Sequence, residues 1–342
     1  MGLKKEQREM IKKFLIENVT EHSRDIVKTA SSFFGISRQA VHKYMKQLIT
    51  DDILIVEGKT RSVSYQLKDK EYTHQIVINP RVREDVVWSK YIKPILPKLE
   101  KNVYDICLYG FTEMMNNIID HSESEQAIIT VKVNAIEIEF MLMDNGVGIF
   151  YKIQKFLNLS DPKYAILELA KGKFTTDEAR HSGEGIYFSS RICDEFVILS
   201  GDLYFRGQTN GDWLTDAERL SKGTTVFMKV NKNTSKNVQK VFDEYSPSED
   251  DYGFSKTTVS VKLLKDEGEE LISRSQAKRL VMRFYKFKEV TLDFRGIKTI
   301  GQPFADEVFR VFQAQNPSVN LVRINTSGEI EKMIKHVLSN AE

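Results

Sequence analysis

The sequence lacks several features that would place it in a protein class at once. It has only two cysteines, Cys107 and Cys193, and both lie in apolar segments. Two are too few for a disulfide framework, so we expect buried, reduced thiols and a cytoplasmic protein. No run of about 18 apolar residues occurs, which predicts that no helix spans a membrane. The first residues have no apolar core typical of secretory signals, and no internal repeat or low-complexity tract is present.

The charge is nearly balanced overall but unevenly distributed along the chain. The 342 residues carry a net charge of +2 and are 41% hydrophobic, an ordinary composition for two or three globular domains. Residues 1–70 hold 14 Lys and Arg against 9 Asp and Glu, whereas the rest holds 36 against 39. This asymmetry indicates an anionic partner for the N-terminal part.

Residues 1–70 predict three helices, over 4–18, 24–34 and 37–52, followed by a hairpin around Glu57–Gly58–Lys59. Ser37 stands where an N-cap is expected. The order resembles a winged helix-turn-helix domain, and the residues with the spacing of that family are Ala30, Gly35, Ile36, Ser37, Val41 and Leu48.

The resemblance to a winged helix implies contacts with double-stranded DNA from the third helix and from the hairpin, or wing. The exposed side chains expected on the third helix are basic or amide-bearing rather than acidic, which favours DNA. A protein-interaction module is the alternative, because winged helices serve both purposes. The candidate DNA contacts are Ser37, Arg38, Gln39, His42, Lys43 and Lys46 on the helix, and Lys59 and Arg61 on the wing.

The rest of the chain divides into two larger blocks and two joining segments. Residues 71–100 predict a connector with a strand-like stretch, HQIVINP at 74–80, and a helical stretch around 82–91. Residues 101–232 alternate between helices and strands. The polar stretch 233–253 is typical of a linker. Residues 254–342 then predict a small α/β unit, with helices over 274–287 and 302–315 and at the C-terminus.

Four short motifs in the second block carry its chemistry. The helix FTEMMNNIIDHS, residues 111–122, has a polar stripe of Glu113, Asn116, Asn117 and Asp120 without Lys or Arg. The others are DNGVGI at 144–149, ending a strand, HSGEG at 181–185, opening a helix, and KGTT at 222–225, entering a strand. Each motif alone is common in proteins. Their order within about 110 residues is far more specific.

This combination resembles the ATP-binding domain of the GHKL superfamily, and most closely its anti-sigma-factor serine-kinase branch. The resemblance implies a Bergerat-type α/β sandwich that binds ATP and Mg²⁺ under a lid, here residues 150–182. Glu113 would be catalytic and orient or deprotonate the attacking water or hydroxyl. Asn117 would coordinate Mg²⁺, and Asp144 would accept a hydrogen bond from the adenine amino group. The remaining implied nucleotide contacts are Gly146, Gly148, Gly183, Gly185 and Thr224.

The chain also departs from relatives of known activity. No helical hairpin with a phosphoacceptor histidine precedes the block, and the block is too short for the transducer domain of gyrases or MutL-type proteins. Residues 289–312, EVTLDFRGIKTIGQPFADEVFRVF, resemble the core of STAS-like domains, the fold of anti-sigma-factor antagonists. The Ser or Thr that receives phosphate in those antagonists is missing at 301–304, and Thr299 is the nearest hydroxyl.

The expected fold class is therefore an α+β multidomain protein: an all-α-plus-hairpin winged helix, a GHKL α/β sandwich and a small α/β STAS-like domain. The leading hypothesis is an ATP-binding regulator, a slow ATPase, in which the GHKL and STAS-like modules control DNA binding by the winged helix. The alternatives are a serine/threonine kinase acting on a separate protein and an interaction scaffold with a structural nucleotide. A protein partner of the STAS-like domain and a homodimer stay open, because no segment marks an interface.

Overall fold

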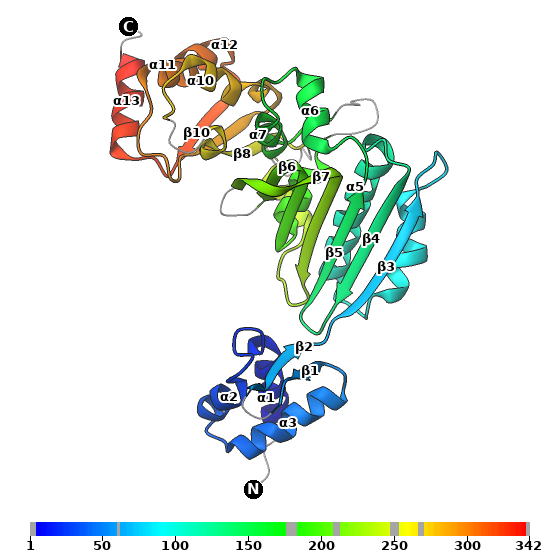
Figure 1. The fold of residues 1–342 in the computed structure, drawn as a ribbon. Helices are drawn as coiled ribbons and strands as arrows, with labels where there is room; N and C mark the ends of the chain where they lie inside the picture. The colour runs from blue at the N-terminus through cyan, green and yellow to red at the C-terminus, as the bar shows by residue number, and fades with distance from the viewer. Residues whose placement is uncertain are drawn as a thin grey trace.

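Three units follow one another along the chain (Figure 1). The computed structural model describes residues 5–59, 62–175, 183–207, 213–246, 253–265 and 270–339, but not the side chains of 213–221. No helix in these ranges is long and apolar enough to cross a bilayer.

The N-terminal unit has the predicted order of three helices and a hairpin. Its core is separate from that of the rest of the chain and includes Leu15, Ala30, Val41 and Leu48. Ser37 accepts a hydrogen bond from the Ala40 amide at 3.2 Å, the predicted N-cap. The elements are α1 (Lys5–Asn18), α2 (Ile26–Phe34), α3 (Arg38–Thr50), β1 (Leu54–Glu57) and β2 (Ser64–Leu67).

The second unit is built on a five-stranded antiparallel sheet with the order β3-β4-β5-β7-β6. Its edge strand β3 comes from the segment that we expected to be a connector, and it pairs with β4 over eight residues. Only Lys68 and Asp69 separate β3 from the wing strand β2. The strands are β3 (Lys70–Val77), β4 (Gln126–Val133), β5 (Glu137–Asp144), β6 (Glu195–Gly207) and β7 (Trp213–Asn231).

Helices cover one face of this sheet and the end at which β5 stops (Figure 1). The apolar side of the longest helix, α5, packs on the sheet, where the Phe111 and Phe140 rings lie 6.2 Å apart. The N-terminal unit lies beyond the opposite end of the sheet. The helices are α4 (Glu84–Val87) with η2 (Trp88–Ile92) and η3 (Lys93–Ile95), α5 (Lys101–His121), α6 (Ile149–Leu157), α7 (Lys163–Lys171) and α8 (Gly185–Ile192).

The third unit is a parallel sheet with the order β10-β9-β8 and its covering helices. The predicted helix over 302–315 is continuous but changes from α to π geometry and back. The elements are β8 (Lys256–Ser260), η4 (Val261–Leu264), α10 (Arg274–Val281), η5 (Phe284–Lys286), β9 (Glu289–Asp293), α11 (Gln302–Asp306), η6 (Glu307–Phe312), α12 (Gln313–Gln315), β10 (Asn320–Ile324) and α13 (Gly328–Ser339).

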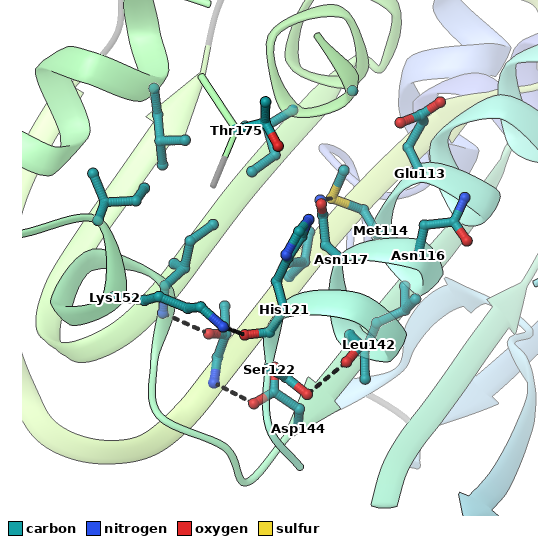
Figure 2. A pocket seen from close by; sticks show the side chains of 18 of the residues that line it. Glu113, Met114, Asn116, Asn117, His121, Ser122, Leu142, Asp144, Lys152 and Thr175 are labelled. Carbon is teal, nitrogen blue, oxygen red and sulfur yellow. Dashed lines mark hydrogen bonds between the residues drawn. The ribbon is translucent and has the colours of Figure 1, made fainter. Parts of the chain in front are cut away.

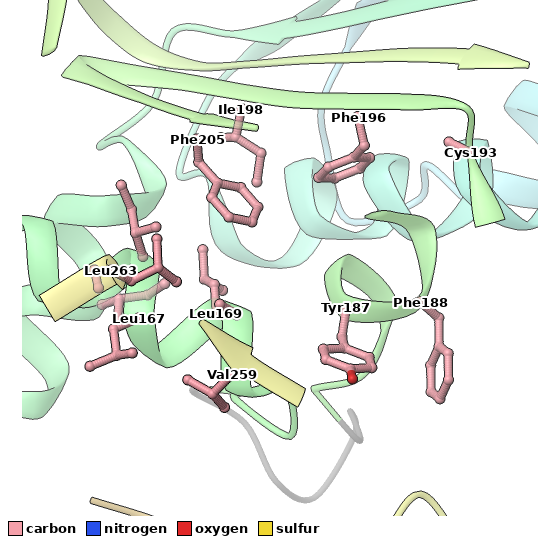
Figure 3. Close-up of a cluster of buried hydrophobic side chains, with 14 of the residues drawn as sticks. Leu167, Leu169, Tyr187, Phe188, Cys193, Phe196, Ile198, Phe205, Val259 and Leu263 are labelled. Carbon is pink, nitrogen blue, oxygen red and sulfur yellow. The ribbon is translucent and has the colours of Figure 1, made fainter. Parts of the chain in front are cut away.

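The segment between the second and third units is packed rather than extended. Within the expected linker, helix α9 (Val238–Glu244) places the Phe242 ring 4.3 Å from that of Phe188 on α8. Beyond it, Leu263 of the third unit lies beside Leu167 of α7, and Val259 lies near Leu169 (Figure 3). The two units therefore share one hydrophobic core, whereas the N-terminal unit has its own.

Candidate functional site

The four sequence motifs meet around a cavity of about 270 Å³ where β5 and β7 approach α5, α6 and the segment after α7 (Figure 2). Successive turns of α5 form part of the cavity wall. The α5 residues that line it are Glu113, Met114, Asn116, Asn117, Ile118 and His121. Much of the remaining wall is apolar and comes from Leu142, Ile149, Ile153, Leu169, Phe174, Ile186 and Val226.

Asp144 forms the polar floor of the cavity. Burial alternates along β5, so Asp144 faces the same side as Leu142, under α5. Its Oδ1 accepts hydrogen bonds from the amides of Gly146 at 2.8 Å and Thr224 at 3.3 Å. Burial raises the pKa of this carboxyl, and the two amide bonds oppose that shift. Within the described residues Oδ2 has no hydrogen-bond partner, so it can accept a bond from a ligand.

The predicted glycines and Thr224 shape the turns around this carboxylate. Thr224 lines the cavity, and its Oγ1 accepts from the Ile149 amide at 3.0 Å. Gly148 also lines the cavity and has a φ of 83°. Gly146 is not among the lining residues; a Cβ there would lie 1.9 Å from the Ser122 carbonyl oxygen. Gly146 therefore acts indirectly: its amide holds the Asp144 carboxylate in place.

Glu113 lies at the other end of the cavity, against the start of α8. A Cβ on Gly185 would lie 2.0 Å from Glu113 Oε2, so only glycine permits this approach. Burial raises the pKa of Glu113 to about 7, and the charges of Glu184 and Glu84 add to the effect. Within the described residues the Glu113 carboxylate forms no hydrogen bond or ion pair. A carboxyl group with this pKa can exchange protons at neutral pH.

Asn117 is one turn from Glu113 and faces the same cavity, as the i, i+4 spacing predicts. Within the part of the chain that the structure describes, its amide nitrogen makes one long contact, of 3.9 Å, with the Met114 sulfur. Asn116 also lines the cavity, whereas Asp120 does not. No group of three or more His, Cys, Asp or Glu that could hold a metal ion occurs among the described residues. A metal here would depend on Asn117 together with ligand oxygens.

The segment expected to be the lid has two different parts. Residues 176–182 lie outside the described residues, and Gly183, with a φ of 72°, lines the cavity. Helix α7, by contrast, is buried at every position from Ala165 to Lys171. It packs on α6 and α8 of its own unit and on β8 and η4 of the third unit. This part of the expected lid is thus held between two units.

Two further lining residues, Lys152 and Phe174, lie in the expected lid 150–182 but had no individual role assigned from the sequence. Lys152 of α6 donates to the His121 carbonyl oxygen at 2.7 Å and to Glu123 Oε1 at 3.0 Å, and so ties α6 to the end of α5. Phe174 follows α7 and donates its amide hydrogen to the Gly183 carbonyl oxygen at 3.1 Å. No motif marks either residue. The apolar lining residues Leu142 and Val226 could have been found, because each is two strand positions from a predicted site residue.

The candidate DNA contacts lie far from the cavity, on the N-terminal unit. The side chains of all six predicted α3 residues are exposed: Ser37, Arg38, Gln39, His42, Lys43 and Lys46. Lys59 of the wing is exposed as well, and Arg61 lies outside the described residues. The buried side of α3 is made by Val41, Met45 and Leu48. The basic side of this helix therefore faces outward.

Two family models match the chain. Residues 109–234 match the histidine kinase-, DNA gyrase B- and HSP90-like ATPases, and residues 276–331 match a STAS-like domain of unknown function. No curated protein matches the chain. The predicted GHKL-type ATPase domain and STAS-like domain are thereby confirmed, and neither match reaches the N-terminal unit. The ATPase domain implies ATP binding.

Proposed function

We propose that this chain is an ATP-dependent regulator whose nucleotide state controls DNA binding by its N-terminal unit. The observation that carries the proposal is the cavity itself. It combines a buried carboxylate with an unpartnered oxygen, apolar walls and the N-terminus of α8 within a GHKL-type ATPase domain. These are the features needed for an amino-bearing aromatic base at one end and phosphates at the other.

The adenine end is assigned to Asp144. Its Oδ1 is fixed by the Gly146 and Thr224 amides, so the carboxylate is held in one orientation before ligand arrives. Oδ2 then accepts a hydrogen bond from the exocyclic amino group of the base. Leu142 and Val226 provide apolar surface for the ring. A preformed acceptor of this kind favours adenine over guanine, which presents a carbonyl oxygen at the equivalent position.

The phosphate end is assigned to the start of α8, next to Glu113 and Asn117. Glu113 and Glu184 place two carboxyl groups near this end, so bare phosphates would be repelled. Mg²⁺ supplies the compensating charge when it is bound. In the described chain it would take the Asn117 carboxamide oxygen, phosphate oxygens and water as ligands, which is the usual composition of such sites. Glu113 would then orient or deprotonate the attacking water.

DNA binding is assigned to α3 and the wing. The support is the outward basic face with Arg38, Lys43 and Lys46 and the excess of Lys and Arg in residues 1–70. Three helices followed by a two-stranded hairpin form the architecture expected of a winged helix. Arginine and lysine on such a helix can neutralise phosphates and contact base edges in the major groove.

A signal from the cavity to the DNA-binding unit has to cross the ATPase sheet. The STAS-like domain and the N-terminal unit lie at opposite ends of the molecule (Figure 1). Strand β4 runs from the cavity end of the sheet to the end next to the N-terminal unit, about 26 Å for eight residues. Before its first residue, Ser124 bonds to Asn145, beside Asp144. After its last residue, Asn134 donates to Asp69 at 2.9 Å, between the wing and β3. We therefore propose that the signal follows the sheet.

The proposal is tested by fluorescence anisotropy with duplex DNA at fixed salt, on the apo, ADP-bound and non-hydrolysable ATP-bound protein. We expect the DNA affinity to differ between nucleotide states, because a ligand shifts an equilibrium only by its difference in affinity. Equal DNA affinity in all three states would refute regulation by nucleotide. Calorimetry with Mg-ATP on the same sample checks binding directly.

Two triple variants distinguish the effect of direct DNA contacts by α3 from the effect of lowering the positive charge of the N-terminal unit. Replacing Arg38, Lys43 and Lys46 with Ala should weaken binding and reduce the dependence on salt, by about one unit of slope per lost phosphate contact. The control replaces Lys5, Arg8 and Lys13 of α1, which are also one arginine and two lysines and are exposed. Equal losses in the two variants would contradict a specific role for α3.

A protein serine/threonine kinase is the second candidate function. The observation that favours it is the raised pKa of Glu113, because such a carboxyl can accept a proton from a hydroxyl as well as from water. Incubation with γ-labelled ATP and candidate STAS-type proteins distinguishes the two. Labelled protein supports the kinase, and labelled free phosphate alone supports a slow ATPase.

A further inference from the structure

A buried cluster of charges joins helix α7 of the ATPase domain to the STAS-like domain. Glu168 and Lys171 are one turn apart on α7, and their charged atoms are 2.5 Å apart. Arg283, in the turn after α10, donates to the other carboxylate oxygen of Glu168 at 2.9 Å. The side chains are at most 9% exposed. The cluster therefore lies inside the junction of the two domains.

The hydrogen bonds within the cluster show that it is a joint and not a ligand site. The Lys171 ammonium group has three bonds, to Glu168 and to the carbonyl oxygens of Arg279 at 3.0 Å and Met282 at 2.9 Å. These account for all three of its donors. The Arg283 guanidinium likewise donates to the Glu168 carboxylate and to the backbone carbonyl oxygens of Gly172 and Lys173. No donor of Lys171 remains for an anion.

Arg283 differs from Lys171 because it also holds the wall of the nucleotide cavity. Its second terminal nitrogen donates to the carbonyl oxygens of Gly172, at 3.3 Å, and Lys173. Its guanidinium lies 5.1 Å from the ring centre of Phe174, over the face of the ring. Phe174 and Thr175 line the cavity. One arginine of the STAS-like domain thus contacts three consecutive residues, Gly172, Lys173 and Phe174, the last of which lines the cavity.

The backbone at Arg283 is shaped for this contact. Its φ is +66°, in the left-handed region that residues with a β-carbon rarely adopt. Such a conformation persists where the surrounding contacts compensate for it. Here it reverses the chain between α10 and η5 and directs the side chain back onto α7. Arg283 is therefore held in place from both sides of the junction.

We propose that Arg283 is a positioning residue of the nucleotide cavity, through which the STAS-like domain fixes the wall at 172–175 and sets the affinity for nucleotide. The inference rests on the proposed nucleotide site and identifies how the third domain acts on it. Coupling of this kind is reciprocal, so an occupied cavity also stabilises the turn around Arg283. The STAS-like domain thereby receives the nucleotide state directly at its α10–η5 turn.

Arg283→Lys is the variant that tests positioning. Lysine keeps the charge but lacks the planar fork that reaches Glu168 and two carbonyl oxygens together. We expect the Kd for Mg-ATP, measured by calorimetry, to rise about fivefold or more, the lower end of typical coupling between sites. Amide hydrogen exchange at 172–175 should become faster, because this segment loses its support.

Arg279→Lys is the matched control. Arg279 joins the same two domains, donating to the Tyr164 hydroxyl at 2.7 Å and lying 4.3 Å from the centre of that ring. Tyr164 is at the far end of α7 and does not line the cavity. We expect the wild-type Kd and wild-type exchange at 172–175. Equal effects of the two variants on both measurements would overturn the positioning role, since any weakening of the interface would then suffice.

The wild-type chain gives a test that does not depend on a variant that folds. Adding Mg-ATP should slow exchange at 283–287, where the Lys286 and Phe287 amides are hydrogen-bonded at 3.1 and 3.0 Å. Unchanged exchange there in a nucleotide-saturated sample would overturn the inference. A wild-type chain that binds no Mg-ATP would instead refute the proposed function, while exchange at 172–175 in the two arginine variants would still decide whether Arg283 positions the wall.

Discussion

Two groups of charged residues in this chain, one buried at a domain junction and one lining the cavity, are built in opposite ways. At the junction of the ATPase and STAS-like domains, Glu168 is bonded to Lys171 and to Arg283, and the Lys171 donors are all used. In the cavity, the carboxylates of Glu113 and Asp144 have no cationic partner among the described residues. Burial raises the pKa of both. Both groups lie within the same continuous core.

The number of protein partners distinguishes charged groups that stabilise the fold from charged groups that are suited to bind a ligand. A buried charge is tolerated when its partners compensate for the lost hydration, and the junction does this entirely with protein atoms. The cavity leaves the compensation incomplete, so a ligand that supplies hydrogen-bond donors or a metal ion would be bound there. Changes to the two groups should consequently have different effects on stability and on activity.

The largest expected effect is on turnover, in Glu113→Gln. The amide keeps the shape of the side chain but cannot accept a proton, and loss of a general base typically lowers kcat by about 10²–10⁴. Mg-ATP binding should be retained, since Glu113 contacts no atom that holds the adenine. Phosphate release under single-turnover conditions and calorimetry give the two quantities. Unchanged turnover would mean that Glu113 only borders the site.

Glu168→Gln should have the next largest effect, on stability rather than on chemistry. Removing the carboxylate of this cluster leaves Lys171 and Arg283 buried together without its compensating charge, which costs about 3–5 kcal/mol for a broken buried pair. Chemical denaturation measures the loss. The control is Glu329→Gln, which breaks another i, i+3 pair, Glu329–Lys332 at 2.9 Å, at an exposed position. That change should cost less than about 1 kcal/mol. Similar losses would contradict the structural role of the junction.

The cavity carboxyl Glu113 should also make the stability of the protein depend on pH. Folding raises the pKa of Glu113 from 4.5 to about 7, so the folded state holds this proton more tightly than the unfolded state does. The resulting stabilisation is complete below pH 4.5 and is lost as the pH rises through 7. It amounts to roughly 3 kcal/mol at 1.36 kcal/mol per pKa unit. Glu113→Gln should therefore raise the Tm relative to wild type at pH 8 and much less at pH 5. The same increment at both pH values would show that the carboxyl does not titrate.

Much of the fold followed from local patterns in the sequence. Ser37 marked the start of α3, and the alternation of β4 and β5 gave both strands. Asn117 and Glu113 were placed together by helical spacing, and the cavity contains both. These features depend on neighbours within a few residues, which is why the sequence alone was sufficient.

The parts that were missed depend on long-range packing. The expected linker looked polar because its apolar residues are few and scattered; in the fold Val241 is buried and Val238, Phe242 and Tyr245 pack against the core. The stretch 74–80 looked strand-like, but its place at the edge of the ATPase sheet was not predicted, because β3 pairs with a strand, β4, that follows only after the whole of α5. Arg283 carries no local signal of its contact with the cavity wall, since that contact joins residues more than 100 positions apart.

Asp144→Asn should have the smallest effect on the protein and the most specific effect on its ligand. The new side chain can keep its oxygen toward the Gly146 and Thr224 amides, so we expect little change in Tm. Its amide nitrogen then replaces Oδ2 and presents a donor to the adenine amino group, which is also a donor. The ATP affinity should fall about tenfold, as expected for a lost bond to a charged acceptor. GTP should lose less, because its carbonyl oxygen can accept from the new amide. If calorimetry shows equal losses for ATP and GTP, the carboxylate serves only to hold the loop, and the cavity's unpartnered oxygen does not select the base.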